Sequence, residues 1–181
     1  MSPRTIGQVP TIYLLRHGDA EPGDGDDAAR ALTPKGERQA RAAGEALATL
    51  GANVDTCLTS PKLRAAETAR LACAALALEP EIAEELRGGP FDALALAAGR
   101  GDTLLVGHEP DFSAEVARLT GANVKLRKGG LAIVEGGTLV ALLRPKDLAA
   151  PRPHELGAGT LPRSVDQRPS PDRVQRGIQL P

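Results

Sequence analysis

Aromatic residues, cysteines and long apolar runs are all scarce in this chain of 181 residues. With no tryptophan, one tyrosine and two phenylalanines, the core must be built from alanine, leucine and valine, which suits helices packed on a sheet. Two cysteines, Cys57 and Cys73, form neither a disulfide framework nor a zinc pattern, so we expect reduced core thiols in a cytoplasmic protein. No apolar run reaches about 18 residues, so no transmembrane helix is expected. Residues 1–10 also lack a signal-peptide pattern.

A large excess of charge of either sign is absent too. The formal net charge is −1, so composition forces no basic face, and neither nucleic acid nor a membrane is expected as a partner. The length fits one domain with a full core. After residue 150 the chain becomes rich in proline and arginine and poor in apolar residues. We therefore expect a folded domain over residues 1–150 and a disordered tail over residues 151–181.

Strand and helix signals alternate along residues 11–143. Short apolar runs bounded by turn residues predict strands over residues 11–15, 54–59, 81–86, 103–106, 131–135 and 138–143. Cap, proline and glycine signals predict helices over residues 34–50, 60–76, 91–98 and 110–120. This alternation indicates an α/β fold: a three-layer sandwich with a mostly parallel central sheet and helices on both faces.

Cationic side chains occur where predicted strands give way to helices. Arg16 and His17 follow the first strand, Arg64 lies in the first turn of the helix after the second, and His108 follows the strand at 103–106. Open α/β sheets bind ligands at the carboxyl ends of their strands, so we expect one shared pocket. Gly18, after His17, would permit a positive φ or a close approach by a ligand. Such a pocket fits a phosphoryl group, because guanidinium groups bind phosphate oxygens in pairs and a protonated imidazole adds a donor.

The spacing of the residues does not fit several other kinds of catalytic or binding motif. A Cys-x5-Arg phosphatase loop would need arginine at positions 63 or 79, where the chain has Leu63 and Glu79. Neither a Gly-x4-Gly-Lys-Ser/Thr loop nor a Gly-x-Ser-x-Gly elbow is present. The three histidines do not pair at a short helical spacing, so we expect no metal site. The acidic stretch at residues 24–27 is expected to be a solvated loop.

Three motifs carry a family resemblance. In chain order they read Arg16-His17-Gly18, Ser60-Pro61-x-x-Arg64-Ala65-x-x-Thr68-Ala69 and Gly107-His108. Over residues 11–143 the chain resembles the histidine phosphatase superfamily, which is phosphoglycerate mutase-like, and within it the short SixA branch of phosphohistidine phosphatases. The resemblance implies that His17 is a nucleophile that becomes phosphorylated and is then hydrolysed. It also implies that the phosphoryl oxygens are bound, with no metal or other cofactor, by Arg16, Arg64 and His108.

The resemblance also implies a proton donor for the leaving group. Larger members carry a Glu or Asp between the second and third motifs, where this chain offers Glu85 and Glu84, and Asp19 is a further alternative. An imidazole leaving group needs less help from such an acid. Residues 65–107 leave little room for a helical lid, and an open pocket favours phosphate on a macromolecule. We expect a protein phosphohistidine phosphatase; the alternatives are a phosphatase for small phosphate esters and a non-catalytic phosphoprotein-binding module.

Overall fold

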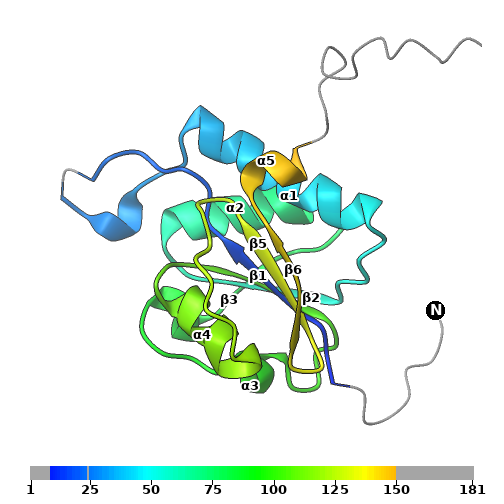
Figure 1. The fold of residues 1–181 in the computed structure, drawn as a ribbon. Helices are drawn as coiled ribbons and strands as arrows, with labels where there is room; N and C mark the ends of the chain where they lie inside the picture. The colour runs from blue at the N-terminus through cyan, green and yellow to red at the C-terminus, as the bar shows by residue number, and fades with distance from the viewer. Residues whose placement is uncertain (1–8, 24, 150–181) are drawn as a thin grey trace, which may run out of the picture. The chain divides into compact units, whose positions relative to one another are not determined.

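The computed structural model describes residues 9–23 and 25–149, so the tail predicted at 151–181 lies outside the described residues. Six strands form one sheet in the order β3-β2-β4-β1-β5-β6 (Figure 1). These strands are β1 (Ile12–Arg16), β2 (Thr56–Thr59), β3 (Glu81–Ile82), β4 (Thr103–Gly107), β5 (Leu131–Glu135) and β6 (Thr138–Leu143).

Strand direction determines which residues meet at each edge of the sheet. The strands β3, β2, β4 and β1 are parallel, β5 is antiparallel to β1, and β6 is antiparallel to β5. Pairing of Arg16 with Gly107 and of Thr59 with Val106 brings the carboxyl ends of β1, β4 and β2 to one edge. Strand β6 ends at the same edge, because two reversals restore the direction of β1. The predicted α/β fold with a mostly parallel centre is confirmed.

Helices cover both faces of the sheet (Figure 1). They are α1 (Pro34–Thr49), α2 (Leu63–Cys73), α3 (Ala93–Ala97), α4 (Asp111–Thr120) and α5 (Pro145–Leu148), with the 3-10 turns η1 (Asp27–Ala29) and η2 (Glu84–Arg87). Tyr13 and Leu15 of β1 belong to the core cluster that includes residues of α1, α2 and α5. Ile12 and Leu14 belong to the cluster that includes residues of α3 and α4. Alternate side chains of one strand thus bury two helical layers, as predicted.

Most predicted element boundaries hold to within two residues, but one helix and one strand are shorter than predicted. The stops at Gly51 and Gly121 are confirmed, since both glycines are left-handed, with φ of 67° and 74°. The helix predicted from Ser60 begins instead at Leu63, and the predicted strand at 81–86 covers only 81–82. That strand stops early because the next residues turn into η2, which buries Leu86. Within the described ranges, no helix is long and apolar enough to span a membrane.

Candidate active site at the carboxyl edge of the sheet

Strand β1 delivers Arg16 and His17 to the edge of the sheet. The backbone N–H of Arg16 donates to the carbonyl of Gly130, and the N–H of His17 donates to the carbonyl of Gly107, both at 3.0 Å. The ladder between β1 and β4 therefore continues one residue past β1. This pairing brings the residue that follows β1 beside the end of β4, which is the strand that His108 follows.

The imidazole of His17 is held in one orientation from both of its ring nitrogens. Nδ1 lies 2.7 Å from the carbonyl oxygen of Gly18, which can only accept a hydrogen bond, so Nδ1 carries the proton. Nε2 consequently has a lone pair, and Nε of Arg64 donates to it at 3.3 Å. A neutral ring with its lone pair on Nε2 is the form that a nucleophilic histidine requires.

Gly18 is needed for packing and not for an unusual φ. A Cβ at this position would lie 2.6 Å from the carbonyl oxygen of Gly36, at the start of α1. The N–H of Gly18 donates to Oγ1 of Thr68 at 3.0 Å, and that hydroxyl donates to the carbonyl of Arg64 at 2.7 Å. The expected positive φ is absent. The close approach that glycine permits is to the protein's own chain, which ties the His17 loop to α1 and α2.

Arg64 is buried and held by an internal carboxylate. Its side chain donates from Nη1 to the backbone carbonyl of Asp27 and from Nη2 to the Asp27 carboxylate, the latter at 3.1 Å. Lys62 and Arg30 contact the same carboxylate at 3.0 and 3.1 Å. Hydrogen bonds from Lys62, Arg30 and Arg64, in that order of effect, hold the pKa of Asp27 well below its usual range. This anion offsets the cost of placing Arg64 at the positive end of α2.

His108 completes the cluster from β4. Its ring centroid lies 5.1 Å from that of His17, and Nε2 lies 2.8 Å from Oγ of Ser60. Its other nitrogen, Nδ1, is buried and has no hydrogen-bond partner within the described part of the chain, and the same is true of Nε of Arg16. Nη1 of Arg16 donates to the carbonyl of Leu126 at 2.9 Å. Buried polar atoms without partners are costly, so both atoms point to a ligand that would satisfy them.

Burial keeps both histidines neutral. It lowers the pKa of His17 to about 4 and that of His108 to about 3. Burial is the largest cause of these shifts; the charges of Arg64 and Arg16 contribute to the lowered pKa of His17, and those of His17 and Arg64 to that of His108. The protonated imidazole expected from the sequence is therefore absent at neutral pH until an anion arrives. The positive charge of the cluster resides on its arginines.

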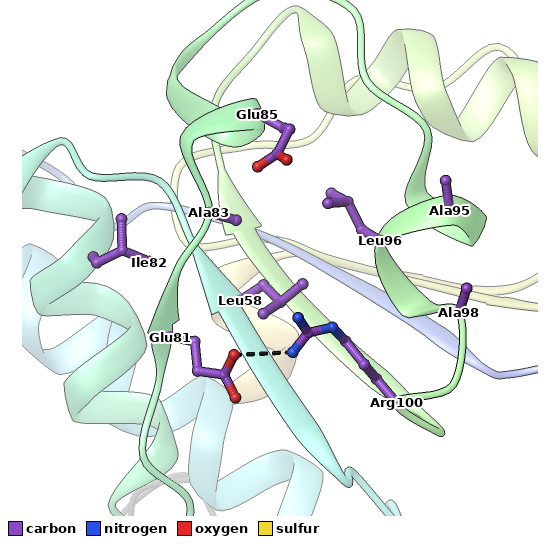
Figure 2. A pocket seen from close by; sticks show the side chains of 9 residues that line it. All are labelled: Leu58, Glu81, Ile82, Ala83, Glu85, Ala95, Leu96, Ala98 and Arg100. Atoms are coloured by element: carbon purple, nitrogen blue, oxygen red, sulfur yellow. Dashed lines mark hydrogen bonds and ion pairs between the residues drawn. The ribbon is translucent and has the colours of Figure 1, made fainter.

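Of the predicted proton donors, Asp19 is ionised, while Glu84 and Glu85 follow β3 at the same edge of the sheet as the cluster. Asp19 accepts hydrogen bonds from Lys128 at 2.8 Å and from Thr33 at 3.2 Å, and the Lys128 bond is the main reason why its pKa is lowered. Glu84 is exposed on η2. Its neighbour Glu85 lines a separate cavity (Figure 2). The other lining residues of that cavity are Leu58, Glu81, Ile82, Ala83, Ala95, Leu96, Ala98 and Arg100.

The sequence predicts one shared site for His17, Arg16, Arg64 and His108, and the structure places all four at one edge of the sheet. The prediction missed Asp27, which was expected in a solvated loop but binds Arg64. No local pattern signals this contact, because 37 residues separate the two in the sequence. Among residues 9–23 and 25–149, no group of three or more His, Cys, Asp or Glu side chains could hold a metal ion.

Comparisons with known sequences identify relatives of this chain. A model of the histidine phosphatase superfamily (branch 1) matches residues 12–95. An uncharacterised protein of a Picosynechococcus species is 36% identical over 140 residues, with 70% of this chain and 85% of that protein covered.

Two solved structures show how widely the fold is shared. The protein histidine phosphatase SixA complexed with tungstate has a TM-score of 0.66 and 25% identity, over 76% of this chain and 99% of SixA. The alpha-ribazole phosphatase from Shigella flexneri has a TM-score of 0.61 and 19% identity, over 77% and 97% of the two chains, and shares the fold alone. Taken with the three motifs, the family model and the similarity to SixA show that the chain belongs to the histidine phosphatase superfamily, in its SixA-like branch.

Proposed function

We propose that the protein is a phosphohistidine phosphatase that removes phosphoryl groups from proteins through a phosphohistidine on His17. Nε2 of His17 attacks phosphorus, the P–N bond of the substrate breaks, and its electron pair stays on the departing imidazole nitrogen. Water then attacks the phosphoryl group on His17, inorganic phosphate leaves, and the lone pair returns to Nε2. The lone pair of Nε2, fixed by the bond between Nδ1 and Gly18, supports the first step.

The cationic cluster would stabilise the charge that moves during transfer. Nε of Arg16 and Nδ1 of His108 have no protein partner in the described ranges, and phosphoryl oxygens would supply one. Arg64 contacts Nε2 of His17 through its own Nε, so this donor would turn to a phosphoryl oxygen as the nucleophile attacks. The Arg16 and His108 donors are already in place before the substrate binds, and such fixed donors stabilise a transition state without a reorganisation cost.

The single observation that carries the choice of phosphohistidine is the ionisation of the carboxyl groups beside the cluster. Asp19 and Asp27 are both ion-paired, and both have a lowered pKa. Neither retains a proton at neutral pH. An alcohol leaving group would need that proton, because water, a comparable oxygen acid, has a pKa of about 15.7. A histidine ring, with a pKa of about 6.5, takes a proton from solvent on its other nitrogen and leaves as neutral imidazole.

The substrate class follows from the same site. SixA, which shares 25% identity with this chain, is a protein histidine phosphatase. We propose a phosphorylated protein as the partner, and the cytoplasm as the compartment, since Cys57 and Cys73 are both free thiols. Small phosphate esters with good leaving groups would also be hydrolysed, because their departure needs no acid.

Trapping the intermediate tests the proposal. The protein is mixed with a phosphohistidine-containing protein, quenched in base within the first turnover, and mapped by mass spectrometry. We expect an acid-labile, base-stable phosphoryl group on His17, and neither this adduct nor phosphate release in His17→Ala. Aryl, alkyl and imidazole phosphates are compared in the same assay. An adduct on another residue, or alkyl phosphates cleaved as fast as phosphohistidine, would contradict the proposal.

A further inference from the structure

Cationic residues continue along the carboxyl edge of the sheet beyond the phosphoryl site. Strand β6 ends at the same edge as β1, and Arg144 follows β6 directly, as His17 follows β1. Only β5 lies between β1 and β6. Neighbouring strands are about 4.8 Å apart, so two strand spacings separate the ends of β1 and β6 by roughly 10 Å. A cation near the end of β6 therefore lies within reach of a molecule whose phosphoryl group is at His17.

The segment before β5 fills the space between these two ends with further cations. Leu126 is buried, and its carbonyl accepts a hydrogen bond from Arg16. Its two neighbours, Lys125 and Arg127, are exposed. Arg127 is near enough to Arg16 to contribute to the lowered pKa of that guanidinium, although burial is the main cause. The buried leucine thus anchors a loop that presents basic side chains beside the phosphoryl site.

One cavity joins this loop to the end of β6. It is lined by Lys125, Arg127, Leu142, Leu143, Arg144 and Asp147. Asp147 is already bound by Arg144, at 2.9 and 3.2 Å. Lys125 and Arg127 have no carboxylate partner within the described part of the chain, so the cavity carries unmatched positive charge. In contrast, Lys128 at the other end of the loop is paired with Asp19.

We propose that Lys125 and Arg127, beside the Arg144–Asp147 ion pair, form a docking row for the carboxylates of an acidic protein surface that carries the phosphohistidine. The inference rests on the proposed function and names the kind of protein that the site would accept. Charge complementarity selects the partner, because the unmatched charge is positive and lies along the edge that leads to His17. Exposed cations bind single anions weakly, so a protein surface with several carboxylates would gain more from the row than a small ester.

Two peptides test the row directly. Both carry one phosphohistidine; one has aspartate three residues to either side, and the other has serine at those positions. An extended chain rises about 3.4 Å per residue, so three residues place the carboxylate roughly 10 Å from the phosphoryl group. Phosphate release gives kcat/KM for each peptide, and inhibition of aryl phosphate hydrolysis gives its inhibition constant. At low ionic strength we expect an acidic-to-neutral preference of about fivefold or more in both quantities.

The variants Arg127→Glu and Arg70→Glu are compared through this ratio, so that any general loss of activity divides out. Arg70 is exposed near the end of α2, away from Arg64, and makes the same charge change. We expect the ratio to fall to about one or below in Arg127→Glu and to persist in Arg70→Glu. A ratio near one in the natural protein, an unchanged ratio in Arg127→Glu, or no inhibition by either peptide would overturn the docking row. Inhibition by the peptides without phosphate release from them would instead overturn the proposed function. The ratio of the two inhibition constants would then still test whether the docking row binds acidic peptides.

Discussion

The buried cationic cluster and the region around η2 both hold charged side chains, but they hold them differently. His17, Arg64 and His108 are each only 6% exposed. Their contacts span 47 residues for Arg64 with His17 and 48 for His108 with Ser60. Around η2, Glu84 pairs with Arg87, and both side chains are more than half exposed. A buried network fixed by distant parts of the chain can hold reacting groups in place, whereas exposed local ion pairs fix little.

Removal of Arg64 should break the buried cluster most severely. Arg64→Met deletes the donor beside Nε2 of His17 and the partner of Asp27. We expect kcat to fall about 10²–10³-fold, the usual result when one fixed donor to a transition state is lost. Arg64→Lys should recover only part of the loss, because lysine cannot form the paired contacts. Arg70→Met, on the same helix, is the control. Near-normal turnover by Arg64→Met would show that the buried contacts do not support catalysis.

Packing around His17 offers a second test of how tightly the buried cluster is held compared with an exposed loop. In Gly18→Ala the new Cβ meets the backbone oxygen of Gly36, which cannot move freely. We expect a loss of about 1–3 kcal/mol in the free energy of unfolding, together with reduced kcat. Gly25→Ala in the neighbouring loop is matched, since nothing lies within 4 Å of its added Cβ. Urea denaturation measures both, and equal stability of the two variants would refute the packing role of Gly18.

The pH dependence of stability should report the buried histidines. The folded pKa values of His17 and His108, about 4 and about 3, lie below the ordinary 6.5. The unfolded chain therefore binds more protons as the pH falls below 6.5, and stability decreases until the folded pKa values are reached. Between pH 7 and pH 5 we expect a loss of about 3–4 kcal/mol in the free energy of unfolding from the two histidines together, beyond any contribution from the carboxyl groups. In His108→Asn the loss should be smaller, and an equal loss there would contradict neutral burial of His108.

The pH dependence of activity should also reflect the lowered pKa of His17. Its neutral form is the nucleophile, and that form persists down to a pH of about 4. The acidic limb of the pH profile of kcat/KM should therefore lie well below 6.5 with an aryl phosphate that has no titrating group in this range. In Arg64→Met the limb should move upward, because the guanidinium is one of the charges that lower the pKa of His17. A limb near 6.5 in the natural protein would mean that His17 is solvated in the free protein.

The four cationic residues could be predicted because each lies at a strand end or, for Arg64, in the first turn of the helix that follows one, and parallel strands bring such ends together. The strands were readable from short apolar runs, and the stops at Gly51 and Gly121 from glycine alone. What the sequence could not show was the partner of each charge. Asp27 binds Arg64 across 37 residues, and only the folded chain shows that contact. The helix start predicted at Ser60 was wrong, because the Ser60 hydroxyl contacts His108 and does not cap α2.

Glu85 is the sharpest remaining test of the difference between the two regions, although we expect its effect to be the smallest. The resemblance to larger family members nominates it as the proton donor, but it lies on η2 and lines a cavity whose residues belong to β3, α3 and their neighbours. Glu85→Gln should change kcat for phosphohistidine by less than about twofold, since an imidazole leaving group needs little help from an acid. Asp111→Ala, which removes the acceptor for the N–H of Gly89 just after η2, controls for loosening of that region. A large loss in Glu85→Gln confined to alkyl phosphates, with phosphohistidine unaffected, would instead identify Glu85 as an acid that reaches the cluster when an ester is bound.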